Sequence, residues 1–386
     1  MPLRLVLTSK AMLSRVVTST VILATLASGC GESSPAAPST GPTGDAASSA
    51  DTLVMDRNGS LGDTGGALAE ANMPEGSSSK LPDAGGNDRD SASNPEGGIA
   101  APPALKWTQE GPMYLFLGIW GSSPNDVYAV EAGGLIMRST GDGTWTGQVS
   151  GTGERLTGVW GSGPNDIYIS VRSNVVLHST GNGVWDHHVF QSGVTFSGVW
   201  GSGPNDVYVF EAGADHTKGD GTWSPQIIEP DGQPTLAMWG SSATDVYAGA
   251  ALGTVYHSVG NGIWIPQKQK LGVGTSSEIA GIAGSGPTDI YAITYKQIFH
   301  SNGDGAWKIQ NLTLATLESL TCVWALDKSA IYIGSSSNLY RSGGDGVWLG
   351  QPIDPKHPSM SIYAVWGTSV NNLYVATTLG IYHGTP

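Results

Sequence analysis

The chain has little charge, little cysteine and no long apolar run. Asp, Glu, Lys and Arg make up only 13% of its 386 residues, and the 18 basic residues, outnumbered by 32 acidic ones, cluster nowhere. Nucleic acid and anionic membrane surfaces are therefore poor partners. Glycine is the opposite case, because its 56 residues outnumber every charged type, which favours a turn-rich β protein over a helical one.

The first thirty residues are typical of an export signal. Residues 16–26 form an apolar run of eleven, which is too short to span a bilayer permanently, and three basic residues precede it without an acid. The letters LASGC that end at Cys30 resemble a lipoprotein signal, although Ala27 stands where Leu is usual. A plain secretory signal with a chance cysteine is the alternative. The resemblance implies that residues 1–30 are a lipoprotein signal and that Cys30 is the lipidation site, which leaves Cys322 unpaired.

The segment after the signal has the composition of a tether. Residues 31–104 are rich in Ser, Gly, Ala and Pro, have almost no aromatic side chains, and carry eleven acids against three bases. Such a stretch cannot bury enough apolar surface to offset its ordering entropy, so we predict a disordered tether. With Gly31 after the cysteine, where inner-membrane retention calls for Asp, we expect an exported protein anchored by lipid in the cell envelope, in the outer membrane.

The rest of the chain, after residue 104, consists of one sequence repeat that occurs seven times. Its first positions are separated by 40, 40, 39, 44, 41 and 42 residues. Eight residues further on, a tyrosine recurs in every unit, and a second tryptophan follows a Gly-Asp-Gly or Gly-Asn-Gly turn. The first positions are Trp120, Trp160, Trp200, Trp239, Ala283, Trp324 and Trp366. The second tryptophans, called closing tryptophans below, are Trp145, Trp185, Trp223, Trp264, Trp307 and Trp348.

Each unit contains four short β-type runs separated by tight-turn residues. Four strands in about 40–45 residues are typical of a propeller blade. The last unit ends after its third run and lacks a closing tryptophan, whereas Trp107 precedes the first unit and belongs to none. The sequence therefore predicts an all-β, single seven-bladed β-propeller over residues 105–386, closed by an N-terminal strand around Trp107 that pairs with the strand from Gly380 to His383.

Two motifs resemble known propellers. The turn STGDGTW at residues 139–145 resembles an Asp-box, the hairpin of sialidase-type and YCF48-like propellers, but is one residue shorter between Ser and Trp. The element VWGS..NDVY is similar to tectonin-type lectin propellers and to repeat lipoproteins of myxobacteria. The resemblance covers residues 106–383 and implies the architecture. It leaves function open, because this fold hosts enzymes, lectins and scaffolds.

A repeated pair of positions predicts a hydrogen-bonded network inside each blade. Antiparallel pairing brings Asp166 near His178 and Ser179, beside Trp185, and a His, Ser, Asp and Trp network resembles the tetrad of WD40 propellers. The alternative, a metal or anion site at each His, needs ligands that adjacent blades hold too far apart. We therefore expect a structural role and no metal or cofactor. The predicted network residues are Asp126, Asp166, Asp206, Asp245, Asp289, His178, His216, His257, His300 and His383, with Arg138 and Arg341 in place of His in two blades.

Ligand binding is expected where the repeats vary. The distance from the first position to the closing tryptophan stays at 23 to 25 residues, whereas the connection to the next unit ranges from 15 to 19. Variable loops on a rigid frame are where specificity is found. The longest connection, residues 265–280, carries two lysines, and another carries His357. The candidate ligand-binding residues are Glu131, Arg155, Arg172, Glu211, Lys268, Lys270, Tyr295 and Lys296.

Three functions fit this pattern. The sequence favours a non-catalytic, monomeric cell-surface module that binds glycan or protein. An envelope assembly scaffold, as in YCF48-like propellers, is the alternative. A glycan hydrolase of sialidase-like architecture is the third, but only Arg155 and Arg172 are left for an arginine triad once the repeat explains the others. Glu131, Glu211 and Glu278 are the acids outside the repeat that such chemistry would use.

Overall fold

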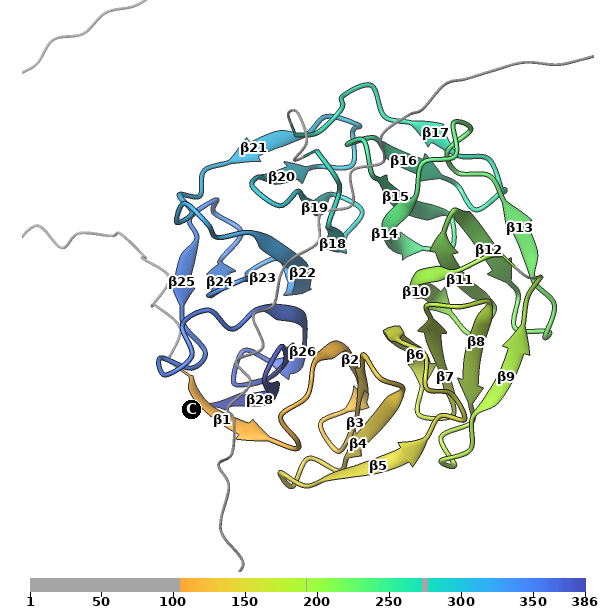
Figure 1. The fold of residues 1–386 in the computed structure, drawn as a ribbon. Coiled ribbons are helices and arrows are strands. Elements are labelled where there is room, and N and C mark those ends of the chain that lie inside the picture. Colours follow the sequence, from red (N-terminus) through yellow and green to blue (C-terminus); the bar gives the residue numbers. More distant parts are fainter. Residues whose placement is uncertain (1–104, 192, 273–276) are drawn as a thin grey trace, which may run out of the picture. The chain divides into compact units, whose positions relative to one another are not determined.

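The computed structural model describes residues 105–191, 193–272 and 277–386. The predicted signal (1–30), its lipidation site Cys30 and the predicted tether (31–104) lie outside the described residues. The described residues form 28 strands in seven antiparallel sheets of four, which stand around a ring (Figure 1). This confirms the predicted all-β, seven-bladed propeller.

Each blade runs outward from the ring axis. The innermost strands of blades 1 to 7 are β2 (Phe116–Ser123), β6 (Leu156–Gly163), β10 (Phe196–Gly203), β14 (Thr235–Ser242), β18 (Gly281–Gly286), β22 (Leu320–Asp327) and β26 (Ile362–Ser369). The second strands are β3 (Asp126–Glu131), β7 (Asp166–Val171), β11 (Asp206–Glu211), β15 (Asp245–Ala250), β19 (Asp289–Ile293), β23 (Ala330–Ser335) and β27 (Asn372–Thr377).

The third and outer strands complete the blades. The third strands are β4 (Leu135–Ser139), β8 (Val175–Ser179), β12 (Gly213–Thr217), β16 (Val255–Ser258), β20 (Ile298–Ser301), β24 (Leu339–Ser342) and β28 (Gly380–Thr385). The outer strands are β5 (Trp145–Val149), β9 (Asp186–Val189), β13 (Ser224–Gln226), β17 (Ile265–Pro266), β21 (Lys308–Gln310), β25 (Leu349–Gln351) and, in blade 7, β1 (Lys106–Glu110).

The hydrophobic core lies between adjacent blades. The second strands are buried almost throughout, with β3 buried from Asp126 to Val130 and β7 from Ile167 to Val171, as expected for strands covered on both faces. One cluster joins Tyr128 and Ile136 of blade 1 to Leu156 and Leu177 of blade 2. Because every blade buries one face against its neighbour, the blades stabilise one another around the ring.

The ring has two distinct faces. The turns between first and second strands and between third and outer strands share one face, called the turn face. The two turns of blade 1 are in contact there, because a Cβ on Gly141 would collide with the Pro124 carbonyl oxygen. The opposite face, called the loop face, carries the turns between second and third strands and the connections between blades. On the turn face Asp142 accepts a hydrogen bond from the Thr144 N–H at 2.9 Å, and Gly141 and Gly143 supply φ of 80° and 83°.

Blade 7 closes as predicted. Strand β1 pairs with β28 in antiparallel register, with Trp107 opposite Gly384 and Thr108 opposite His383. In blade 1 the closing Trp145 lies opposite Ser139 in the same way. Trp107 is half-buried against the core that Tyr382 and other blade 7 residues form. The N-terminal strand therefore completes the last blade, as the missing seventh closing tryptophan indicated.

Small residues let the innermost strands approach one another. A Cβ at Gly118 would come within 3.3 Å of the Gly158 Cα in the next blade. Cys322 occupies the equivalent position in blade 6, with its Sγ 3.9 Å from the Ile362 carbonyl oxygen. Burial raises the pKa of this free thiol to about 12, so Cys322 is protonated at neutral pH and a poor nucleophile.

Candidate functional site

The predicted Asp–His pairs lie on the turn face, one in each of blades 2 to 5. In blade 2 the Asp166 Oδ1 lies 2.8 Å from the His178 Nε2, and the Asp166 Oδ2 accepts the Ser162 hydroxyl at 2.6 Å. Tyr168 stacks on the His178 ring at 4.4 Å between centroids. The same pairing joins Asp206 to His216, Asp245 to His257 and Asp289 to His300, at 2.8, 2.8 and 2.9 Å.

Two members of the predicted network are wrong. The serine is Ser162 of the first strand, because Ser179 accepts the Gly181 N–H at the tight turn instead. The tryptophan is not a member either, because the Trp185 Nε1–H points to the preceding blade and donates to the Gln148 Oε1 at 2.9 Å. Strand pairing places residues opposite one another, but it does not indicate which hydroxyl or indole turns toward the carboxylate.

Three blades vary this network. Arg138 replaces His in blade 1 and contacts the Asp126 carboxylate at 2.7 Å. His383 of blade 7 binds Asn372 through Nε2 at 2.7 Å and the Glu110 carboxylate through Nδ1 at 3.0 Å. In blade 6, Arg341 reaches the Ser329 carbonyl oxygen at 3.4 Å, and Ala330 stands where blades 1 to 5 have Asp.

The geometry of this network fits the predicted structural role. Nucleophilic catalysis by serine needs the imidazole beside the hydroxyl, whereas here Asp166 lies between Ser162 and His178. Among the described residues, no group of three His, Cys, Asp or Glu side chains could hold a metal ion. The network ties the first, second and third strands of a blade together.

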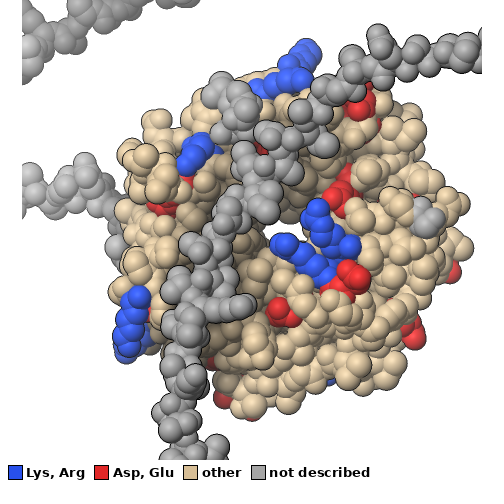
Figure 2. Space-filling view, in the orientation of Figure 1, with Lys and Arg blue, Asp and Glu red and all other residues tan. Residues whose placement is uncertain are grey.

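The candidate ligand-binding residues share the loop face but form no single group. They come from blades 1 to 5: Glu131 ends β3, Arg155 and Arg172 flank β6 and β7, Glu211 ends β11, Lys268 and Lys270 follow β17, and Tyr295 and Lys296 turn between β19 and β20. The Arg172 N–H donates to the Arg155 carbonyl oxygen at 2.7 Å, which brings the two loops of blade 2 together. Figure 2 shows basic and acidic side chains gathered beside the central opening.

Several of these side chains are already engaged. The Thr195 hydroxyl donates to the Glu211 carboxylate, and the Lys296 ammonium group donates to the Glu318 carbonyl oxygen. Burial, together with a hydrogen bond to Glu278, raises the pKa of Tyr295 to about 12. These groups join neighbouring loops of the protein itself, which leaves Arg155, Arg172, Lys268 and Lys270 as exposed cations on this face.

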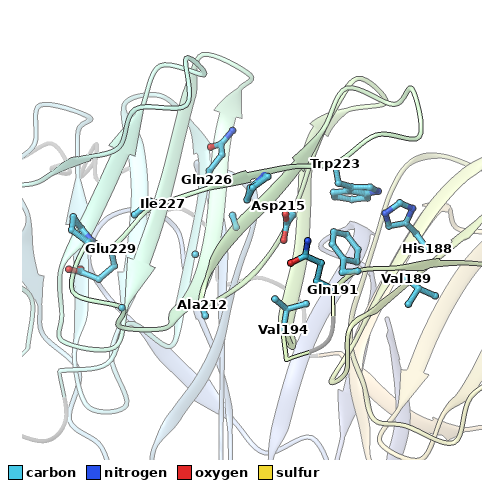
Figure 3. A pocket seen from close by; sticks show the side chains of 16 residues that line it. His188, Val189, Gln191, Val194, Ala212, Asp215, Trp223, Gln226, Ile227 and Glu229 are labelled. Atoms are coloured by element: carbon cyan, nitrogen blue, oxygen red, sulfur yellow. The ribbon is translucent and has the colours of Figure 1, made fainter. Parts of the chain in front are cut away.

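A hollow of about 700 Å³ opens on the loop face between blades 2 and 3. Its walls come from β9, β12 and β13 and the connections that follow β9 and β13 (Figure 3). Trp223 and His188 stand on one side, Ile227 and Glu229 on the other, and Asp215 lies between them (Figure 3). The rings of Phe190 and Trp223 pack edge to face with centroids 5.5 Å apart.

This hollow exists because blade 3 breaks the repeat at one position. The other six blades place a large buried side chain there: Met137, Leu177, Tyr256, Phe299, Tyr340 and Tyr382. Blade 3 has Asp215, which is shorter and half-buried. Burial raises the pKa of Asp215, and the nearby His188 partly offsets that effect.

Asp215 lacks the hydrogen bond that tyrosines at the same position make in two other blades. In blade 7 the Tyr382 hydroxyl donates to the Asp354 carboxylate of the preceding connection at 3.1 Å, and in blade 4 Tyr256 donates to Glu229 in the same way. In blade 3 a carboxylate stands in place of that phenol. No described residue donates a hydrogen bond to it, and its side chain lines the hollow (Figure 3).

Sequence reasoning missed Asp215, Trp223 as a wall of the hollow, and Glu110. The signal for Asp215 was present, because aligned repeats show one acid in a column of large apolar and aromatic residues. Glu110 follows Trp107 by three residues, as Gln148 follows Trp145. The bond that Glu110 accepts from the Trp145 Nε1–H at 3.0 Å repeats the bond between Gln148 and Trp185, whereas no repeat rule predicts its contact with His383 at 3.0 Å.

Comparisons with known proteins identify the architecture. No protein-family model matches the sequence, and no curated protein matches it. The described residues contain no helix that is long and apolar enough to cross a membrane. The similar solved structures include YCF48 and other β-propellers at low sequence identity, which shows the fold alone.

Three of these structures illustrate the range. YCF48 bound to D1 peptide is 15% identical, with a TM-score of 0.60 over 74% of this chain and 100% of its own. A catalytically inactive virginiamycin B lyase from Staphylococcus aureus, solved with quinupristin, is 12% identical, with a TM-score of 0.64 over 73% and 99%. The WD40 propeller domain of Doa1 is 13% identical, with a TM-score of 0.58 over 73% and 96%. The chain thus has a β-propeller fold.

Proposed function

We propose that this chain is a non-catalytic binding module that recognises a protein partner through its loop face. The hollow between blades 2 and 3 carries this proposal. At its rim Val189 and Ile227 are 63% and 78% exposed, beside the aromatic wall of Trp223 and Phe190. Exposed apolar side chains around an aromatic pocket are the composition of a protein-binding hot spot.

Two further points support a protein partner. The propeller of YCF48 has been solved with a peptide bound, so this fold accommodates a polypeptide ligand in a protein of similar architecture. Two of the three acids outside the repeat are also engaged by side chains of the protein itself, Glu211 by Thr195 and Glu278 by Tyr295. Glycan recognition is the second candidate, because Trp223 offers a ring face beside the hydrogen-bonding groups of Asp215 and Gln226.

Site-specific photocrosslinking tests the proposed face. A benzoylphenylalanine replaces Ile227 on the loop face of the full chain, and in a matched control it replaces Val184, which is 60% exposed on the turn face. We expect a discrete protein adduct from position 227 and none from position 184. Equal adducts at both positions, or none at 227, would contradict the proposal. Binding to a glycan array without an adduct at 227 would favour the second candidate.

We also propose that lipid on Cys30 anchors the chain in the cell envelope. The export signal and the cysteine after small residues support this anchor. Cys30→Ala should move the protein from the membrane fraction to the soluble fraction of cells, with the thermal unfolding of the propeller unchanged. Unchanged partition between the two fractions would refute the anchor.

A further inference from the structure

We infer that the hollow between blades 2 and 3 is a cation pocket, in which Asp215 and the Trp223 ring hold a lysine or arginine side chain of the partner. This inference rests on the proposed function and deepens it, because it names the chemical group that the loop face selects. The first support is the hollow itself, whose volume of about 700 Å³ is that of a ligand pocket.

The second support is charge. Asp215 is a half-buried carboxylate that receives no hydrogen bond from the described residues, and its only ionisable neighbour of consequence is His188. A second acid, Glu229, lines the opposite wall and accepts a hydrogen bond from Tyr256. Among the described residues, no Lys or Arg lines the hollow. A desolvated carboxylate without a counter-ion is an unfavourable arrangement, which an incoming cation would relieve.

The third support is the aromatic wall. Trp223, Phe190 and His188 pack against one another, with the His188 and Trp223 centroids 5.9 Å apart, and all three line the pocket. The face of an indole attracts ammonium and guanidinium groups, most strongly where water is excluded. A carboxylate beside an indole is therefore suited to a cationic side chain, whereas a neutral amide or an anion would leave Asp215 uncompensated.

The repeat shows that this arrangement is not a requirement of the fold. Six blades fill the same position with a side chain that is at most 7% exposed, and the ring closes around all of them. Blade 3 keeps the neighbouring parts of the blade pattern, including the pair of Asp206 and His216 at 2.8 Å. The exchange of a core residue for a carboxylate is thus local to this pocket.

Titration with blocked tripeptides tests the inference on the full chain. The probes are N-acetylated, C-amidated Gly-Lys-Gly and Gly-Arg-Gly, with Gly-Gln-Gly as the neutral control and spermidine as a free polyamine. Binding is followed at pH 8 by the indole N–H resonances in ¹⁵N-labelled protein, with the Trp223 resonance assigned by its loss in Trp223→Phe. We expect a saturable shift of the Trp223 resonance with the Lys or Arg probe and none with the Gln probe.

Two variants make the test specific. Asp215→Asn keeps the size of the side chain and should weaken binding of the cationic probes about 10- to 100-fold, the effect of losing one charge-assisted contact. Asp186→Asn removes an equal charge from the exposed end of β9 and should leave affinity within about twofold.

The outcomes separate the pocket from the wider proposal. Equal shifts with the Gln probe, unchanged affinity in Asp215→Asn, or no shift of Trp223 would overturn the cation pocket. Saturation by spermidine with no response to either tripeptide would overturn the assignment to a partner's side chain. A crosslinked adduct at position 227 that persists in any of these cases would leave the protein-binding face standing and remove only the pocket's role in it.

Discussion

Asp215 shows how one residue can exchange stability for a binding surface. Its counterpart in blade 2, Leu177, is fully buried and packs against blade 1, whereas Asp215 leaves an open hollow toward blade 2. The carboxylate also carries a desolvation cost, since burial raises its pKa. Residues at binding sites commonly oppose the stability of the fold that holds them.

Asp215→Leu should therefore stabilise the propeller while it removes cation binding. We expect a gain of about 0.5–2 kcal/mol in the free energy of unfolding, measured by urea denaturation at pH 7. Asp186→Asn, an exposed change of equal charge, should stay within about 0.5 kcal/mol of the parent chain. A loss of stability in Asp215→Leu would show that the carboxylate has a structural partner after all.

The same variant has a predicted pH dependence. The folded-state pKa of Asp215 is raised, so the folded chain binds this proton more tightly than the unfolded chain does. The destabilising contribution of the ionised carboxylate is therefore present above the folded pKa and disappears as the pH falls toward the unfolded value near 3.8. The stability difference between Asp215→Leu and the parent chain should shrink as the pH is lowered through this window.

At the scale of strands, a tryptophan and a glycine lock neighbouring blades. The ring of Trp120 in β2 lies against Gly161 of β6, and a Cβ there would meet both the ring and the Asp166 carbonyl oxygen. The contact recurs at Gly201 under Trp160, Gly240 under Trp200, Gly284 under Trp239 and Gly121 under Trp366. Blade 5 has Ala283 in place of the tryptophan, so no ring covers the equivalent position of blade 6. At that position blade 6 has Ala325 in place of glycine, and its Cβ is accommodated.

Gly161→Ala should accordingly destabilise the propeller by about 1–3 kcal/mol, because the methyl group overpacks the contact between β2 and β6. Gly163→Ala is the matched control, since it lies two residues further along β6 and nothing lies within 4 Å of the Cβ that it would add. The measurement is the midpoint of chemical denaturation. Equal effects of the two substitutions would mean that the backbone conformational freedom of glycine, not the Trp120 contact, decides the cost.

The pair of β7 and β8 offers a further prediction. His178→Ala removes the partner of the Asp166 carboxylate and the stack on Tyr168, and we expect a loss of about 1–3 kcal/mol in unfolding free energy. His357→Ala, whose imidazole is 45% exposed on a connection, should change stability little although it also faces a carboxylate. Unchanged stability in His178→Ala, together with loss of partner binding, would favour a functional role for the ring of histidines.

The strands were predictable because each carries its own local signals, and the site was not. The spacing of tryptophans and tyrosines determined the blade number, and the missing last strand indicated closure by residues near Trp107. The hollow depends on which side chains from blades 2 and 3 face one another, such as Phe190 beside Trp223, and pairing within a blade does not determine that. Loop residues such as Glu211 and Lys296 looked free in the sequence because their partners, Thr195 and the Glu318 carbonyl group, lie in other segments.

At the scale of the whole molecule, β1 joins the two ends of the ring through more than backbone pairing. Glu110 accepts the Trp145 Nε1–H of blade 1 and contacts His383 of blade 7, so one side chain connects the first and last units. Burial raises the pKa of Glu110, but the hydrogen bonds from His383 and Trp145 outweigh it and lower the pKa below its usual value. Its stabilising contribution is then present above the unfolded pKa and lost as the pH falls through the lower folded value.

A propeller without this closing strand exposes the edge of β28 to solvent. An unpaired edge in the last blade is a template for pairing with another chain, and the contacts of Trp107 with Gly384 and the blade 7 core are lost with it. Trp107→Ala should lower the unfolding free energy by about 3–5 kcal/mol, toward the lower end because Trp107 is only half-buried.

A chain that begins at Glu110 should aggregate, whereas deletion of residues 31–100 should leave thermal unfolding unchanged. Light scattering during a thermal ramp distinguishes these cases, and a monomeric, fully stable chain without residues 1–109 would show that seven blades close without the N-terminal strand.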